Sequence, residues 1–274
     1  MIMKNAKPAP DFYQRDNEIK SIKEGGNIIA PSISAWKDFA WTKDYFEKKP
    51  KGGFFIWVKE GGSFPMSTLI EIASFNISQK LDNLIVVEKD AELSSFCHSL
   101  KSSLKGVHSA STKIIIKEGV ALNYSQRNVW KQGDEFSAHY QFLIEKGGRL
   151  KSSTVNYGTG SRIKTREDIF LLEKGASADF RIKMIADKKT EIESESYMYG
   201  EDETRGHLEC TGVIIDKDSK IASVPGIICD SNKAMLTHEA TIGRIAEEEL
   251  TYLRMRGLSE KKATELIISS FLNS

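Results

Sequence analysis

KIIIKEGVAL (113–122) runs a short apolar segment into a charged turn that contains a glycine. The pattern returns along most of the chain, in FFIWVKEGG (54–62), NLIVVEKDAEL (83–93), QFLIEKGGRL (141–150), IFLLEKGASADF (169–180), RIKMIADKKTEI (181–192) and TGVIIDKDSKI (211–221). When the segments are aligned on the last apolar residue, the turns fall at Gly61, Asp90, Gly119, Gly147, Gly175, Lys188 and Asp218, so the successive spacings are 29, 29, 28, 28, 13 and 30. A repeat of this size is typical of a solenoid.

The residue types in each repeat favour strands joined by tight corners. The apolar runs are rich in Ile, Val and Phe, which strands prefer. Gly or Asp at the corner tolerates a positive φ angle. A parallel β-helix explains both features, because each coil buries its apolar face against the coils above and below. An antiparallel sandwich, which also contains many short strands and turns, is the alternative.

The two ends of the chain lack this repeat. We therefore predict three regions: an N-terminal helical or irregular segment (1–53), a parallel β-helix core (54–241) and a C-terminal helical region (242–274). In the first region, WKDFAWTKDYFEKKP (36–50) has an aromatic pattern at helical spacing that ends at Pro50. This pattern predicts a short helix, because proline interrupts helices.

The C-terminal region reads as two helices. IGRIAEEELTYLRMR (242–256) predicts the first helix, and Gly257 follows it as a natural helix terminator. Ser259 can cap the second helix, in which Ala263, Leu266, Ile267 and Phe271 recur at helical spacing. We therefore expect a C-terminal helical hairpin.

Composition limits the possible partners and compartments. Lys and Arg number 39 against 38 Asp and Glu, so the formal net charge of +1 excludes a strong general attraction to nucleic acid or anionic membrane. Three cysteines are too few for a disulfide framework and fit a reducing cytosol. No apolar run reaches the roughly 18 residues of a membrane span, and the N-terminus lacks the apolar segment of a signal peptide. We expect a cytoplasmic protein.

Cysteine, histidine and glutamate gather near the end of the repeats. Glu239 follows Cys210 at a spacing of one repeat, so we predict that the two stack in adjacent coils. His238 is then expected on the other face or bent toward a strand end. Thiolate, imidazole and carboxylate together suit an iron or zinc site. The alternative is that Cys210 is a small core residue and the histidine forms a structural hydrogen bond.

Other conspicuous residues are assigned to packing. Cys229 follows two isoleucines and is predicted to lie in the core. The four tryptophans are predicted to be packing anchors: Trp36, Trp41, Trp57 and Trp130. The chain has no GxxxxGK[ST] loop, so it is not expected to be a P-loop ATPase itself.

Four motifs near the C-terminus resemble one family. They are RGHLEC (205–210), SVPGI (223–227), THEATIGRI (237–245) and the pattern LxxRGLSxxxAxxLIxxxF (253–271). Together they resemble the SufB/SufD family, the scaffold subunits of the SUF iron–sulfur cluster assembly machinery. The resemblance implies a right-handed parallel β-helix with a C-terminal helical domain. It also implies an assembly scaffold and not an enzyme, with ATP hydrolysis in a partner subunit.

The resemblance carries over to particular residues. Cys210 matches the SufB-type cysteine of cluster assembly, Glu239 matches the glutamate of that site, and His238 matches the histidine that the SufD-type subunit contributes. These three residues are the implied ligands of a transient iron–sulfur cluster. Cys97 lies near the SufB-type cysteine linked to sulfur acceptance and is a candidate for that role.

The resemblance also implies partners. A SufC-type ABC ATPase would dock on the C-terminal helices, with Leu253, Arg256, Gly257, Leu266 and Phe271 as candidate contacts. The chain would form a homodimer, or a heterodimer with a SufB/SufD-like chain, and the nascent cluster would form near that interface.

Three interpretations of the function follow. The first is a SufBD-like scaffold that holds a nascent cluster. The second is a SufD-like brace that binds the ATPase but no metal, and Tyr140 favours a compact SufD-like member because the family has a tunnel lysine there. The third is a β-helix carbohydrate-active enzyme, which requires carboxylates on one face of the solenoid. The acids of the repeats instead lie mainly at turns, at Glu60, Glu118, Glu145 and Glu173.

Overall fold

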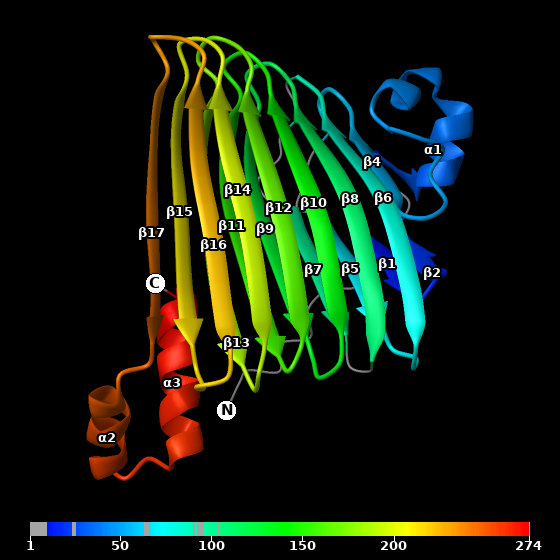
Figure 1. The fold of residues 1–274 in the computed structure, drawn as a ribbon. Coiled ribbons are helices and arrows are strands. Elements are labelled where there is room, and N and C mark those ends of the chain that lie inside the picture. Colours follow the sequence, from blue (N-terminus) through cyan, green and yellow to red (C-terminus); the bar gives the residue numbers. More distant parts are fainter. Residues whose placement is uncertain are drawn as a thin grey trace.

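The computed structural model of the chain describes residues 10–23, 26–62, 66–89, 91, 96–102 and 105–273. Over these residues, 17 strands form two facing sheets (Figure 1). The nine-stranded sheet contains, in chain order, β1 (Phe12–Arg15), β2 (Glu18–Ile22), β5 (Met66–Ile72), β7 (Phe96–Ser102), β9 (Ala121–Trp130), β11 (Arg149–Thr159), β13 (Ser177–Asp187), β15 (Arg205–Ile214) and β17 (Met235–Arg244). The eight-stranded sheet contains β3 (Ile28–Pro31), β4 (Phe54–Val58), β6 (Ile77–Val87), β8 (Gly106–Ile116), β10 (Glu135–Ile144), β12 (Arg162–Leu171), β14 (Glu191–Gly200) and β16 (Lys220–Cys229).

From β4 onward, successive strands alternate between the two sheets. Each strand pairs in parallel with its equivalent in the next coil, so that Arg149 lies beside Ala121, and Glu191 lies beside Arg162, in each case one repeat apart in the sequence. This arrangement confirms the predicted parallel β-helix and excludes the antiparallel sandwich.

The short spacing between the turns at Gly175 and Lys188 has a simple cause. These two turns lie at opposite ends of β13, so the aligned segments pass there from one sheet to the other.

The interior of the solenoid is apolar and partly aromatic. Side chains along each strand alternate between the buried inner face and the outer face, as in β10 and β11. Aromatic rings meet across coils and sheets: Trp130 stacks on Phe136 with centroids 4.7 Å apart, and Phe142 meets Phe180 at 5.1 Å. Each coil therefore buries its inner face against its neighbours, as the repeat predicts.

The N-terminal segment contains two short helices in place of the single helix predicted over 36–50, and the first begins earlier, at Ser32. It also contains strands that the sequence pattern does not predict. The helices are α1 (Ser32–Asp38) and the 3-10 helix η1 (Ala40–Asp44). β1 extends one sheet by pairing in parallel with β5, and β3 extends the other by pairing antiparallel with β4. The helices cover the outer face of β4, β6 and β8 with a second core, in which Trp36, Trp41 and Trp57 pack against Phe55 and Ile115.

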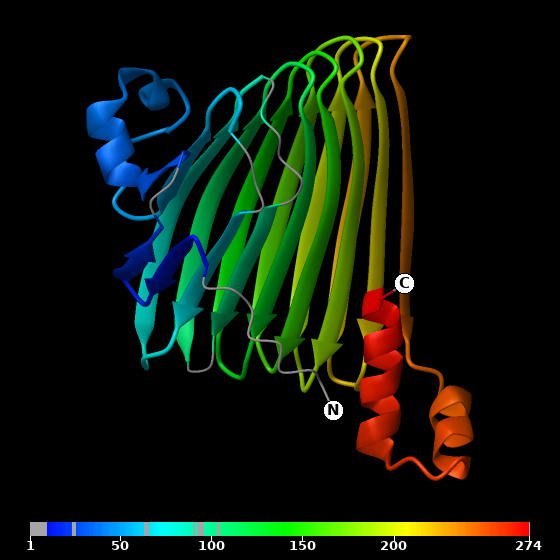
Figure 2. The same ribbon diagram turned by 180° about the vertical axis from the view of Figure 1, so that it is seen from behind.

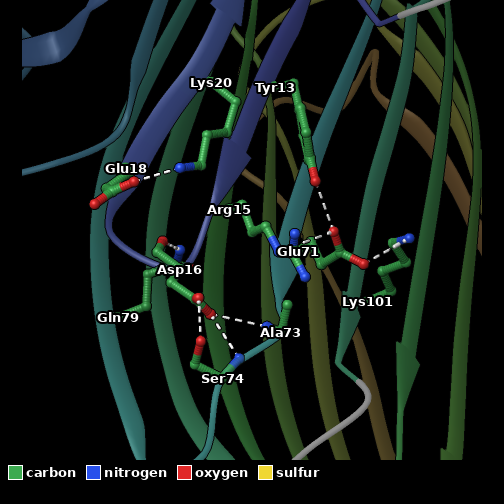
Figure 3. Close-up of polar contacts among 10 residues, drawn as sticks. All are labelled: Tyr13, Arg15, Asp16, Glu18, Lys20, Glu71, Ala73, Ser74, Gln79 and Lys101. Carbon is green, nitrogen blue, oxygen red and sulfur yellow. Dashed lines mark hydrogen bonds and ion pairs between the residues drawn. The ribbon is translucent and has the colours of Figure 1, made fainter.

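A polar network fastens the β1–β2 hairpin to the first coils (Figure 3). The Asp16 carboxylate, at a residue with φ of 54°, accepts hydrogen bonds from the Ala73 amide at 2.8 Å and the Ser74 hydroxyl at 2.8 Å. Burial opposes ionisation of Asp16, but these hydrogen bonds outweigh it and lower the pKa of the carboxyl. Nearby, Glu71 accepts from Tyr13 at 2.7 Å and pairs with Lys101 at 2.8 Å.

The C-terminal hairpin consists of α2 (Glu247–Met255) and α3 (Glu260–Asn273). The helix predicted over 242–256 begins later than expected, at Glu247, because Ile242 and its neighbours continue β17 as far as Arg244. Gly257 ends α2 as predicted: its φ is +90°, its amide donates to Arg254, and the next amide donates to Leu253. The predicted cap of α3 is also present, since Ser259 Oγ accepts from the Lys262 amide at 3.4 Å.

Hydrogen bonds from Lys183 and Arg244 tie this hairpin to the solenoid. Lys183 of β13 donates from Nζ to the Phe271 carbonyl at the end of α3, over 2.9 Å. Arg244, which precedes α2, donates to the backbone carbonyls of Asp216 and Lys217 in the turn after β15. Figure 2 shows α3 alongside the last coils, with α2 projecting beyond them. None of the helices in the described part of the chain is long and apolar enough to cross a membrane.

Candidate functional site

Cys210 lies on the inner face of β15, next to the last strand of its sheet. Its side chain is 0% exposed and is flanked in register by Ile182 of β13 and Ala240 of β17. Burial raises the pKa of the Cys210 thiol to about 11, although the hydroxyls of Ser223 and Ser196 partly offset this effect. At neutral pH the buried group is therefore a thiol, and it must be exposed or bind a metal to become a thiolate.

The register around Cys210 differs from the predicted stacking. Cys210 pairs with Ala240, because the coil from β15 to β17 is one position longer than the spacing assumed in the prediction. His238 pairs with Leu208 and shares the inner face with Cys210, whereas Glu239 pairs with Glu209 on the outer face. The prediction that Glu239 stacks beside Cys210 is therefore wrong, and His238 is the residue on the same face.

The three implied cluster ligands do not form one site within the chain. His238 and Glu239 are both exposed on β17, while Cys210 is buried on β15. Among the residues that the structure describes, no group of three or more His, Cys, Asp or Glu side chains is placed to hold a metal ion. The roles of Cys210, His238 and Glu239 in cluster binding stay predictions.

The other two cysteines lie on different strands. Cys97 belongs to β7, between Ser67 of β5 and Ser125 of β9, and its side chain is outside the described residues. Cys229 is exposed at the end of β16, so its predicted place in the core is wrong. The cause is position in the solenoid: β16 belongs to the last coil, and within the described chain no further coil covers it.

This end of the solenoid is open. β16 and β17 are the last strands of their sheets, and the described chain places no strand beyond either of them. Their exposed apolar side chains are Val224, Ile227, Ile228, Met235 and Ile242. Unpaired strand edges beside exposed apolar groups are suited to pairing with another chain.

A polar stripe runs through the interior toward Cys210, and the sequence reasoning missed it. Glu167 of β12 is 1% exposed, and its carboxylate accepts a hydrogen bond from Ser196 of β14 at 2.9 Å. Further along, Gln126 and Asn128 of β9 are also buried, and Asn128 donates to Asn156 at 2.7 Å. Strand alternation identifies Glu167 as inward-facing, because it lies in phase with Ile163 and Ile169.

The buried Glu167 predicts an unusual pH dependence of stability. Burial raises the pKa of Glu167 from 4.5 to about 7, so the folded chain keeps a proton that the unfolded chain releases. The free energy of unfolding is then expected to fall as pH rises from 5 to 8, by roughly 2–3 kcal/mol. Glu167→Gln is expected to remove this decrease in the free energy of unfolding. Urea unfolding of both proteins at pH 5 and at pH 8 measures the effect. Glu193→Gln, on the exposed outer face, is the control, and an unchanged pH dependence in Glu167→Gln contradicts the assignment.

The predicted ATPase contacts fall into two groups. Leu253, Leu266 and Phe271, together with Val213 of β15, line one apolar hollow between α2 and α3 with a volume of about 700 Å³. Arg256 and Gly257 lie instead at the end of α2, where the Arg256 guanidinium sits 5.3 Å from the centroid of the Tyr252 ring. The structure thus brings the three apolar candidates together and leaves the other two at the connecting turn.

Two of the acids at the turns of the repeats, Glu118 and Glu145, take part in ion pairs. Lys117 pairs with Glu145 at 2.7 Å, and Glu118 pairs with Lys146 at 3.6 Å and with Lys89 at 3.9 Å. Surface ion pairs of this kind stabilise a fold only weakly. These contacts account for Glu118 and Glu145 without a glycan-cleaving site.

Comparison with known proteins places the chain in a family. The family model described as "SUF system FeS cluster assembly, SufBD core domain" matches residues 72–203 and 198–271. The iron–sulfur cluster assembly SufBD family protein of Methanothermobacter thermautotrophicus is 24% identical over 91% of this chain and 72% of its own length. A SufBD family protein of Archaeoglobus fulgidus is 24% identical over 95% of this chain and 84% of its own length. The iron–sulfur cluster assembly protein SufB of Bacillus subtilis is 24% identical over 96% of this chain and 63% of its own length. With its parallel solenoid and a family match that spans most of its length, the chain belongs to the SufBD family of iron–sulfur cluster assembly proteins.

Proposed function

We propose that this chain is a scaffold subunit that helps to assemble or transfer a nascent iron–sulfur cluster at an interface with a second SufB/SufD-type chain. The observation that carries the proposal is the position of Cys210, one strand from the open end of the solenoid. A partner that pairs with β16 and β17 would cover the exposed apolar side chains there and bring its own ligands near this thiol. His238, on the same inner face, is the second ligand of this chain, and Glu239 faces the outer side of the interface.

The nascent cluster is the cargo of this scaffold. Thiolate sulfur and imidazole nitrogen are ligands that iron accepts, and the partner chain would complete the set. Because Cys210 is buried with a raised pKa, cluster binding requires a movement that exposes it. We propose that a SufC-type ABC ATPase, which hydrolyses the ATP, drives this movement through the C-terminal region (242–274).

The contacts of the hairpin support this coupling. Lys183 links α3 to β13, the strand next to β15, and Arg244 links the start of the hairpin to the turn after β15. A displacement of the helices would therefore pull on β13 and on the turn after β15, next to and at the end of the strand that carries Cys210. Cys97, on β7 in the interior of the same sheet, is the candidate for sulfur acceptance.

Docking of the ATPase on the hairpin predicts a specific loss. Leu266 is 51% exposed at the rim of the apolar hollow, so Leu266→Asp leaves the fold intact but places a charge in the interface. We expect this variant to weaken capture of the SufC-type ATPase at least about tenfold. Co-elution on a sizing column measures the effect. Phe75→Asp is the control, because Phe75 is 70% exposed between β5 and β6, and equal capture by both variants contradicts docking at the hollow.

A SufD-type brace that binds the ATPase without metal is the second candidate. The burial of Cys210 favours it, since a thiol that stays buried ligates nothing. The brace predicts normal ATPase capture and no dependence of cluster content on Cys210.

A further inference from the structure

A pocket lies on the outer face of the solenoid, far along the sheet from β16 and the C-terminal hairpin. It has a volume of about 260 Å³ and is formed by the segment after η1 and by the outer faces of β6, β8 and β10. Figure 1 shows α1 and β6 toward the end of the molecule opposite to β17, with β8 and β10 next along the sheet. Neither the cluster site nor the ATPase surface uses this pocket.

Three lysines line the pocket, and they differ from several other cations on this face. Lys164 pairs with Glu193 at 3.2 Å and Arg162 with Glu191 at 3.5 Å, in each case one coil away. Within the described chain, Lys48, Lys80 and Lys113 form no ion pair within 4 Å. In the adjacent coils, the register neighbours of Lys113 are Leu84 and Gln141, neither of which can neutralise it.

Lys113 is the most enclosed of the three lysines. Its side chain is half-buried, and burial lowers the pKa of its ammonium group, opposed only by the charge of Glu47. Partial removal of a charge from water is costly when no carboxylate lies within ion-pair distance, and an anion that binds beside Lys113 recovers that cost. Lys113 is therefore the centre of any anion site in this pocket.

The remaining titratable groups set the net charge of the pocket and its margin. Glu47 and Asp82 also line it, so its lysines exceed its carboxylates by one, three against two. His139 lies at the margin, where its Nε2 atom meets the buried Asp168 carboxylate at 2.7 Å, and Arg166 holds the same carboxylate at 3.0 Å. The imidazole is thus fixed in orientation beside the pocket.

We propose that this pocket binds a small oxyanion, a phosphate or a carboxylate group, through Lys113 with Lys48 and Lys80. A compact anion with one or two charges fits both the volume and the excess of one positive charge. An ammonium forms charge-assisted hydrogen bonds with either class of oxygen, so the experiment must separate them.

In the test, the full chain is titrated with inorganic phosphate, and binding is measured from the line width of the phosphorus NMR signal. In a separate titration with succinate, binding is measured by calorimetry. Ionic strength is held constant in both titrations. We expect saturable binding of at least one of the two probes, weakened at least about tenfold by Lys113→Met, since a charge-assisted contact is lost. Phosphate binding alone assigns a phosphate site, and succinate binding alone assigns a carboxylate site.

Two further variants make the test decisive. Lys48→Met changes a residue in the segment after η1, outside the sheet, and is expected to weaken binding as well. It replaces Lys113→Met as the test variant if Lys113→Met fails to fold. Lys164→Met is the matched control on the same outer face and should bind as the wild type does. Absence of saturable binding of both probes, or equal binding by wild type, Lys113→Met and Lys48→Met, overturns the proposal. The experiment needs no ATPase or cluster, so its outcome is independent of the scaffold function.

Discussion

Replacement of Trp130 by alanine is expected to lower the free energy of unfolding by about 3–5 kcal/mol, the typical cost of removing a fully buried tryptophan. Trp130 is 1% exposed at the end of β9, where it stacks on Phe136 and lies 5.5 Å from the ring of His108. The lost side chain leaves a cavity between the two sheets that the paired strands cannot close. Urea unfolding of the variant and the wild type measures the change.

Two controls define the mechanism. Trp130→Phe is expected to cost much less, below about 1.5 kcal/mol, because it keeps an aromatic ring and the Trp130 Nε1 group has no hydrogen-bond acceptor among the described residues. Trp57→Ala removes a tryptophan from the outer core, where the side chain is only partly buried, and should cost less than Trp130→Ala. If Trp57→Ala is the more destabilising variant, the stability of the chain resides in the N-terminal segment and not in the solenoid interior.

Much of the fold follows from the sequence because the repeat length equals the length of a coil. The turn positions Gly61, Gly119, Gly147 and Gly175 all have the positive φ angles that corner glycines predict. The hairpin follows from the signal that ends α2 at Gly257 and the cap that starts α3 at Ser259, which act locally and do not depend on packing.

The errors of the sequence interpretation concentrate in the last coil. Its one additional residue shifts Glu239 by one position, and in a strand one position changes the face on which a side chain lies. Cys229 has the apolar neighbours of a core residue but belongs to β16, which the described chain leaves uncovered. The pairing of β17 with β15 likewise keeps Ile242 in a strand despite its helical spacing.

Polar residues inside the solenoid were the other omission. Glu167 lies in a strand with charged neighbours on both sides, so composition alone gives no sign that it points inward. Only the phase of the alternation separates it from Arg166, which faces outward. Gly206 in RGHLEC is also an inner position: a Cβ atom there would collide with Met198 Sδ and lie 3.0 Å from a Leu236 methyl, so any side chain requires Met198 to move.

Loss of the Cys210 thiol is expected to abolish the nascent cluster. If Cys210 supplies the thiolate of the shared site, Cys210→Ala leaves iron with too few ligands at the interface, whatever the partner contributes. The substitution is small and the side chain lies in the core, so the fold and the ATPase-docking hairpin should persist. Cys229→Ala is the matched control, because Cys229 is an exposed cysteine on the neighbouring last strand of the other sheet.

The most direct measurement is anaerobic reconstitution of the complete complex, with the SufC-type ATPase, a SufB/SufD-type partner, iron and sulfide. Cluster content is read from the visible iron–sulfur absorption band, and ATPase co-elution confirms that each complex has assembled. We predict that wild type and Cys229→Ala form the band and that Cys210→Ala loses it while still binding the ATPase. A full band in Cys210→Ala would contradict the assignment of this chain as a cluster-holding scaffold.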